Sequence, residues 1–166
     1  MALEIERKFL LKNNEWAHEA TESISITQGY LSRDPKRIVR VRVMQRRSTD
    51  GGAVIETKGT LTVKGINEGA VREEFEYDIA VEDAKCMLEH MAQDPILTKI
   101  RYLVPRPEGT WEVDIFGGEL EGLELAEIEL TAAEVSFDLP DWIGEEVTDN
   151  LAYYNSNLLE RVKSEA

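Results

Sequence analysis

The stretch that decides the fold lies at the start of the chain, where charged and apolar residues alternate: Glu4-Ile5-Glu6-Arg7-Lys8-Phe9-Leu10-Leu11. Successive side chains of a β-strand point to opposite faces of its sheet. One face of a strand over about residues 3–11 is therefore charged and the other is mainly apolar, with Glu4, Glu6 and Lys8 opposite Ile5 and Phe9.

Two later stretches repeat this alternation with complementary charges. Arg40 and Arg42 share a face of residues 38–43, and Glu127 and Glu129 share a face of residues 123–130. A single strand of this kind is best explained by an antiparallel sheet with one wetted face. Three such strands carrying both signs of charge favour a shared charged interior that holds a metal and an anion.

The strands between these stretches also carry charges at every second position. They are Lys64; Arg72, Glu74 and Glu76; Lys99 and Arg101; and Glu112 and Asp114. We interpret Glu112 as a solvated rim residue, and Arg7, Lys12, Arg46 and Arg47 as surface charges. The competing interpretation is a set of surface cross-strand ion pairs, each worth only ~0.2–1 kcal/mol.

The order of patterns predicts a mainly β (α+β) fold. Strands are expected over about residues 3–11, 25–31, 38–45, 53–64 (as one kinked strand or two), 71–79, 97–104, 110–116 and 123–130. Helices are expected over 14–22, 82–93, a short segment from 131, and 155–163. About eight strands joined mostly by short turns suggest an antiparallel sheet that closes into a barrel.

Composition limits the class of protein. The 166 residues predict one domain over 1–166, and the longest apolar run is too short for a membrane-spanning helix. Net charge is -14, and residues 107–160 hold 15 acids and no Lys or Arg, which disfavours nucleic acid as a partner. The absence of a signal-peptide core and the single Cys86, read as an apolar filler of the helix 82–93, fit the cytoplasm.

The spacing Glu4-x-Glu6-x-Lys8 resembles the ExExK motif of the CYTH, or triphosphate tunnel metalloenzyme, superfamily. The Arg-x-Arg strand and the late Ala-Glu-Ile-Glu-Leu strand follow in the family's order, and the resemblance to the short bacterial inorganic triphosphatases covers nearly the whole chain. It implies an eight-stranded antiparallel closed β-barrel, with charged residues lining the bore and a few helices packed outside.

The resemblance also implies residue roles. It assigns metal ligation to Glu4, Glu6 and Glu129, with Glu127 on the same strand; phosphate contacts to Arg40, Arg42, Lys64, Lys99 and Arg101; and supporting positions to Glu74 and Asp114. In short bacterial members a tyrosine matching Tyr30 pairs with the lysine matching Lys8, which is the proposed general base and a substrate contact. One departure is Ala152, which stands where such members often carry an arginine.

The expected activity is hydrolysis of a triphosphate, with inorganic tripolyphosphate giving diphosphate and phosphate, and with Mg²⁺ or Mn²⁺ as the cation. Class IV adenylate cyclase and thiamine triphosphatase remain open within the family. A barrel that binds polyphosphate or nucleotide without turnover is a third possibility, and a lipocalin-like barrel with an apolar bore is a fourth. A small anionic substrate is the expected partner, and a homodimer is compatible with the sequence.

Overall fold

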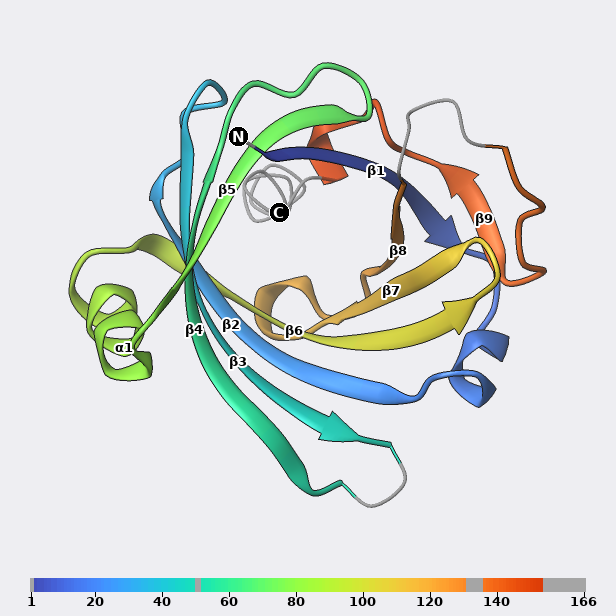
Figure 1. The fold of residues 1–166 in the computed structure, drawn as a ribbon, viewed down its shortest axis with the longest axis horizontal. Coiled ribbons are helices and arrows are strands. Elements are labelled where there is room, and N and C mark those ends of the chain that lie inside the picture. The colour runs from blue at the N-terminus through green and yellow to red at the C-terminus, as the bar shows by residue number, and fades with distance from the viewer. Residues whose placement is uncertain (1, 50–51, 131–135, 154–166) are drawn as a thin grey trace.

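The computed structural model describes residues 2–49, 52–130 and 136–153, and shows a ring of strands (Figure 1). The expected helices from 131 and over 155–163 lie outside the described residues. The strands are β1 (Ala2–Leu11), β2 (Glu22–Ser32), β3 (Ile38–Ser48), β4 (Val54–Lys64), β5 (Val71–Ile79), β6 (Gln93–Arg106), β7 (Gly109–Phe116), β8 (Glu124–Glu129) and β9 (Ile143–Glu146).

The sheet closes on itself. Its strand order is β5-β4-β3-β2-β6-β7-β8-β1-β9, and β5 also pairs with β1 along Ala2–Ile5, so eight antiparallel strands form a barrel. Strand β1 joins three neighbours: β5 at its start, β8 along Glu6–Leu10 and the short β9 at its end. The predicted closed barrel is confirmed, and β9 is an addition that the sequence patterns did not predict.

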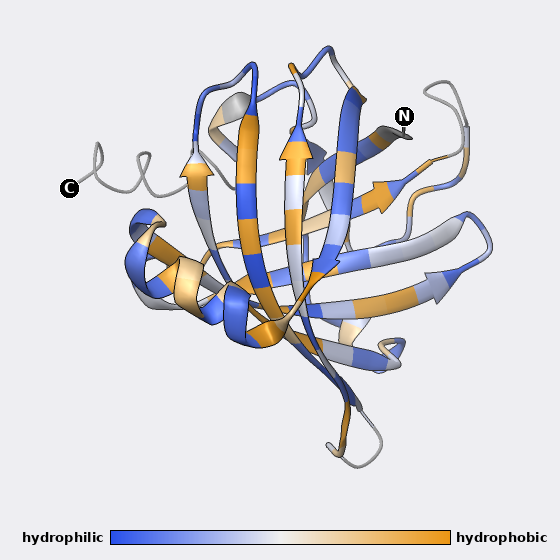
Figure 2. Ribbon diagram, turned by 60° about the vertical axis from the view of Figure 1, so that its left-hand side comes forward, coloured by the Kyte–Doolittle hydropathy of each residue, from blue (hydrophilic) through white to orange (hydrophobic). Residues whose placement is uncertain are grey.

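Because side chains alternate along the strands, the barrel wall has a charged face toward the bore and an apolar face on its other side. The hydropathy colours accordingly change repeatedly along the strands in Figure 2. Charged residues face the bore. The opposite face of β1, β7 and β8 is covered by a cluster of buried apolar residues that includes Phe9, Trp16, Trp111, Ile128 and Trp142. The Trp111 ring centroid lies 5.5 Å from that of Phe9 and 5.6 Å from that of Trp142.

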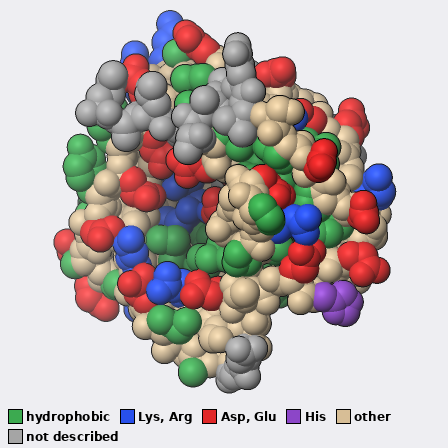
Figure 3. All heavy atoms as spheres, turned by 45° about the vertical axis from the view of Figure 1, so that its right-hand side comes forward, with side chains coloured by type: hydrophobic (Ala, Val, Ile, Leu, Met, Phe, Trp, Pro, Cys, Tyr) green, Lys and Arg blue, Asp and Glu red, His purple; other side chains and the backbone are tan. Residues whose placement is uncertain are grey.

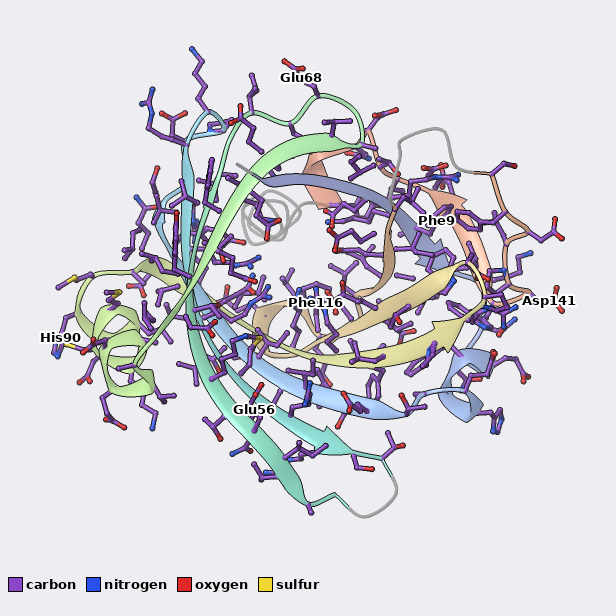
Figure 4. All side chains as sticks on the ribbon, viewed as in Figure 1. Phe9, Glu56, Glu68, His90, Phe116 and Asp141 are labelled. Atoms are coloured by element: carbon purple, nitrogen blue, oxygen red, sulfur yellow. The ribbon has the colours of Figure 1, made fainter. Side chains whose placement is uncertain are left out.

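A second apolar cluster occupies one end of the bore. Leu97, Phe116 and Leu125 are buried there, and each has the same strand parity as the charged bore residues of its own strand. Figure 4 labels Phe116 within the ring of strands and Phe9 near β9. The charged part of the bore therefore has an apolar floor.

The helix α1 (Val81–His90) packs outside the barrel against β3 and β4. Glycines in the wall allow this approach, because a Cβ at Gly59 would lie 3.0 Å from the Ala84 Cβ, and one at Gly29 would lie 3.2 Å from the Leu88 Cδ2. Only Ala84 of the helix is fully buried, and Cys86 is exposed. The interpretation of Cys86 as an apolar filler is therefore wrong.

Other differences concern element boundaries. The helix expected over 14–22 is a short 3-10 helix over Glu15–His18, because β2 already begins at Glu22. Residues 54–64 form one continuous strand rather than two. Two further 3-10 turns span Gly118–Leu120 and Leu151–Tyr153. In the described part of the chain, no helix combines the length and apolar character needed to cross a membrane.

Candidate active site

A cavity of about 200 Å³ lies inside the barrel above the apolar floor. Figure 3 shows the hollow with Lys and Arg atoms deep inside it and Asp and Glu atoms around it. Six basic and six acidic side chains line it: Lys8, Arg40, Arg42, Lys64, Arg72 and Arg101 with Glu6, Glu74, Glu76, Glu112, Glu127 and Glu129; Tyr30 and Ile38 complete the lining.

Two buried arginines of β3 form the cationic side of the cavity. Arg40 is 6% exposed and Arg42 is 4% exposed. The Arg42 Nε and Nη2 atoms donate to Gln28 Oε1 at 2.8 and 2.5 Å. Burial, together with the charges of Arg40 and Arg101, lowers the pKa of Arg42 to about 9. Burial and the neighbouring like charges therefore disfavour the charged form of Arg42.

Arg40 keeps unused hydrogen-bonding capacity. Its Nη2 donates to Thr62 Oγ1 at 3.3 Å and lies 3.7 Å from Glu76 Oε1. Its buried Nε has no hydrogen-bond partner among the described residues. A buried donor without an acceptor is costly, so this atom favours an occupant of the cavity that offers oxygen acceptors.

Asp114 on β7 holds two cations from β6. Its Oδ2 accepts from Lys99 Nζ at 2.6 Å, and its two oxygens accept from Arg101 Nε and Nη2 at 2.7 and 2.9 Å. Burial alone raises the pKa of Asp114, but Arg101 and Lys99 outweigh it and hold that pKa below its usual value. Lys99 and Asp114 do not line the cavity; Asp114 lies behind Arg101 and fixes its orientation.

The same network includes Glu112, whose carboxylate lies 2.5 Å from Arg101 Nη1 and lines the cavity. Burial raises the pKa of Glu112, and Arg101 offsets only part of that effect. The interpretation of Glu112 as a solvated rim residue is wrong. Glu112 and Asp114 point to the same side of β7, and Arg101 pairs with both carboxylates inside the barrel.

Lys8 is buried and paired rather than exposed. Its Nζ lies 3.2 Å from Glu127 Oε1 and donates to the Tyr153 carbonyl at 3.1 Å. Burial raises the pKa of Glu127, but Lys8 and Arg101 outweigh it and place that pKa well below the usual range. The contact makes Glu127 the counter-ion of Lys8 in this structure. The metal-ligand role that the resemblance implied for Glu127 stays a prediction.

The carboxylates suited to a metal are Glu6 and Glu129. They are directly opposite each other in the β1–β8 register, and both line the cavity. The side chain of Glu4 lies outside the described residues, although its backbone pairs with Arg72. Among the described side chains, no group of three or more metal-binding residues is close enough to hold an ion. The oxygen-only donors nevertheless fit Mg²⁺ or Mn²⁺, which keep several waters as ligands.

The far wall of the cavity adds residues that the site prediction omitted. Lys64 Nζ lies 3.6 Å from Glu74 Oε2, which agrees with a supporting role for Glu74. Arg72 and Glu76, on the same strand as Glu74, also line the cavity. Their alternation was visible in the sequence, but nothing in it showed that this part of β5 would close against β1.

Tyr30 lines the cavity and is 3% exposed. Its hydroxyl accepts a hydrogen bond from Gln28 Nε2 at 3.2 Å, and the Arg33 guanidinium lies 5.6 Å from its ring centroid. The resemblance implied a pair between Tyr30 and Lys8. In the described structure the hydroxyl contacts Gln28 instead.

The inward direction of the charges excludes the lipocalin-like alternative. That alternative requires Arg40, Arg42 and the late glutamates to face solvent, whereas all of them line the cavity, with Glu129 at a more exposed position. Ile128 packs instead into the outer apolar cluster. The bore is polar, and the apolar core lies outside it and at its floor.

Comparison with known proteins agrees with this geometry. The CYTH domain family model matches residues 2–162. An inorganic triphosphatase of Acetivibrio thermocellus is 42% identical over 159 residues, covering 96% of this chain and 94% of that protein. An inorganic triphosphatase of Nitrosomonas europaea is 31% identical over 158 residues, covering 93% and 95%.

A solved structure of an inorganic triphosphatase matches with a TM-score of 0.59 at 29% identity, and the match covers 95% of each chain. The likeness thus extends over the barrel and over the sequence that builds its charged bore. On these grounds the chain belongs to the CYTH domain family.

Proposed function

We propose that this protein hydrolyses inorganic triphosphate to diphosphate and phosphate with the help of a divalent cation. The observation that carries the proposal is the barrel cavity that is lined both by Arg40, Arg42 and Arg101 and by the carboxylates of Glu6 and Glu129. Guanidinium groups bind phosphate oxygens in a planar, two-point geometry, and carboxylates suit Mg²⁺ or Mn²⁺. The names of the two curated relatives support the same reaction.

The size and lining of the cavity favour the inorganic substrate over a nucleotide. Its volume of about 200 Å³ is below the ~300–1,000 Å³ that is usual for pockets of drug-sized ligands. Tyr30 and Ile38 are the only uncharged lining residues described, which leaves little surface for stacking a base or a thiazole ring.

Each group of residues has a distinct task in this proposal. Arg40, Arg42 and Arg101 hold the phosphates, while Asp114 keeps Arg101 in place through two hydrogen bonds. Lys8 lies beside Glu127, where its ammonium group can contact a phosphate, or its amine, once deprotonated, can accept a proton from the attacking water. A cation held by Glu6 and Glu129, with Glu4 next along the strand, would neutralise phosphate charge and polarise the reacting phosphorus.

A substrate panel tests the proposal. Purified protein is given tripolyphosphate, ATP, thiamine triphosphate or diphosphate in Mg²⁺, in Mn²⁺ and in EDTA, and the products are identified. We expect phosphate release from tripolyphosphate that is lost in EDTA and restored by either metal. Faster turnover of ATP or thiamine triphosphate would instead indicate an adenylate cyclase or a thiamine triphosphatase of the same family. Tight binding without phosphate release would identify a binding barrel, and undiminished turnover after exhaustive chelation would exclude the metal.

A further inference from the structure

Gln28 of β2 is fully buried and bridges two residues of the cavity wall. Its Oε1 accepts from Arg42 Nε at 2.8 Å and from Arg42 Nη2 at 2.5 Å, and its Nε2 donates to the Tyr30 hydroxyl at 3.2 Å. Gln28 itself is not a lining residue. Its amide therefore acts from behind the wall, through Arg42 on one side and Tyr30 on the other.

The direction of this chain of hydrogen bonds is set by chemistry. A guanidinium has donors and no acceptor, so the amide oxygen of Gln28 must face Arg42. The amide nitrogen must then face Tyr30, and because an NH₂ group only donates, the Tyr30 oxygen must accept. The hydroxyl proton of Tyr30 consequently points away from Gln28.

That proton has no acceptor within the described structure, since Gln28 is the one described hydrogen-bond partner of the Tyr30 hydroxyl. The hydroxyl lies in the wall of a cavity whose other described lining residues are all charged except Ile38. Lys8 does not take the proton, because its described amine contacts, with Glu127 and the Tyr153 carbonyl, are made by its own N–H groups. A buried donor facing such a cavity is suited to an anionic oxygen.

The neutrality of Gln28 matters as well. Among the described residues Arg42 has no carboxylate partner, whereas Lys8 and Lys64 pair with one carboxylate and Arg101 with two. The amide thus orients the Arg42 guanidinium without cancelling its charge. A glutamate in the same place would neutralise the cation and would also accept the Tyr30 proton.

We propose that Gln28 is a positioning residue that turns the Tyr30 hydroxyl into a hydrogen-bond donor to a phosphate oxygen of the substrate, while holding Arg42 as an uncompensated cation. This inference rests on the proposed triphosphate substrate. It differs from a Tyr30–Lys8 pair in a measurable way: a donor to the substrate acts on affinity, whereas a partner of Lys8 acts on turnover.

The test is a double-mutant cycle of Tyr30→Phe and Gln28→Glu with tripolyphosphate and Mg²⁺. In the natural background, Tyr30→Phe removes a hydrogen bond to a charged acceptor and should raise KM about 10- to 100-fold with little change in kcat. In the Gln28→Glu background, Tyr30 donates to the new carboxylate and not to the substrate. There the same Tyr30→Phe change should leave KM nearly unaltered, whatever Gln28→Glu does by itself.

Two matched variants control for the substitutions themselves. Gln45→Glu alters an amide whose Oε1 accepts from Arg47 Nη2 at 2.5 Å away from the cavity, and Tyr77→Phe alters a tyrosine that is 58% exposed. Both should keep natural kinetics. Isothermal titration of tripolyphosphate in EDTA should reproduce the affinity pattern of the cycle without turnover, and circular dichroism should establish that each variant is folded.

The outcomes separate the inference from the function on which it rests. If the unaltered protein does not turn over tripolyphosphate, the proposed function fails. If it does, an equal Tyr30→Phe effect in both backgrounds overturns the role of Gln28. A fall in kcat at constant KM for Tyr30→Phe overturns donation to the substrate. Because this result needs only the single variant Tyr30→Phe, it tests the proposal even if Gln28→Glu does not fold.

Discussion

The two faces of the barrel wall contrast sharply in what they contribute. On β7, Glu112 and Asp114 point into the bore and bind Arg101, whereas Trp111 and Val113 point outward and are completely buried. Neighbouring residues of one strand thus serve different purposes. The outer face buries aromatic area, which stabilises the fold, while the inner face gathers charges whose burial is costly unless they are paired.

This division teaches that stability and binding can be changed separately in this fold. The outer cluster contains Phe9, Trp111 and Trp142 in edge-to-face contacts, which add to the free energy of burial. The inner wall leaves Arg42 without a carboxylate and Arg40 Nε without a hydrogen bond among the described residues. Substitutions on the two faces should therefore affect different measurements.

The largest effect is expected from the inner face. Arg40→Ala combined with Arg42→Ala should lower kcat/KM for tripolyphosphate by ~10²–10⁴-fold, because two charged contacts to phosphate are lost. The melting temperature should stay the same or rise, since the repulsion and burial that lower the pKa of Arg42 are removed. Arg47→Ala, on the same strand outside the cavity, is the control. Natural kinetics in the double variant would contradict the assignment of both residues.

The next effect concerns Lys8, which the inner face holds between Glu127 and the Tyr153 carbonyl. Lys8→Ala and Lys8→Gln should lower kcat by ~10²–10⁴-fold with a smaller change in KM, because proton transfer acts in the transition state. Lys8→Arg separates a base from a charged contact, since arginine stays protonated. Full kcat in Lys8→Arg would exclude the general base, and a mainly raised KM in Lys8→Ala would identify a phosphate contact.

The outer face should respond in the opposite way. Trp111→Ala should lower the free energy of unfolding by about 3–5 kcal/mol in urea denaturation, because it empties the centre of the aromatic cluster and removes the donor to Glu108. The folded fraction of Trp111→Ala should keep the kcat/KM of the unaltered protein. Trp111→Phe should cost less, as it retains a ring. Lost activity with unchanged stability would show that this wall shapes the cavity directly.

Period-two alternation was enough to predict most of the wall and its direction. Arg40, Arg42 and Glu127 all face the bore as their strands predicted, because a strand leaves each side chain only two directions. Both signs of charge on several strands then indicated a common interior. The sequence resemblance added the closed barrel with a charged bore, whereas the order of the strands around the ring was not predicted.

What the sequence did not reveal depends on contacts between strands. Glu127 and Glu129 look alike in the pattern, yet cross-strand register puts Glu127 beside Lys8 and Glu129 beside Glu6. Gln28 looks like an ordinary polar strand residue until Arg42 and Tyr30 are brought to it. Strand β9 has only four residues, Ile143–Glu146, which are too few to show an alternating pattern, and it pairs with the end of β1.

The smallest expected effect concerns Lys99, a buried charge of the inner face. Burial, supported by Arg101 and Arg42, lowers its pKa to about 7 although Asp114 opposes the shift. A bound polyanion raises that pKa, because negative charge favours the ammonium. Between about pH 7 and pH 9, binding should therefore take up protons at Lys99, and affinity should fall as pH rises.

Calorimetry of tripolyphosphate binding at pH 8, in buffers of different ionisation enthalpy, measures this proton uptake. Tripolyphosphate can itself exchange protons on binding, so the comparison is made with Lys99→Met, which keeps the length of the side chain and removes the titrating group. The unaltered protein should take up a larger fraction of a proton than the variant, by less than one. Equal uptake would mean that Asp114, 2.6 Å away, already keeps Lys99 fully charged in the free protein. In that case pairing with carboxylates would keep the cations of the inner face charged before substrate binds. The inner and outer faces would then differ only in which side chains they carry and how these are arranged.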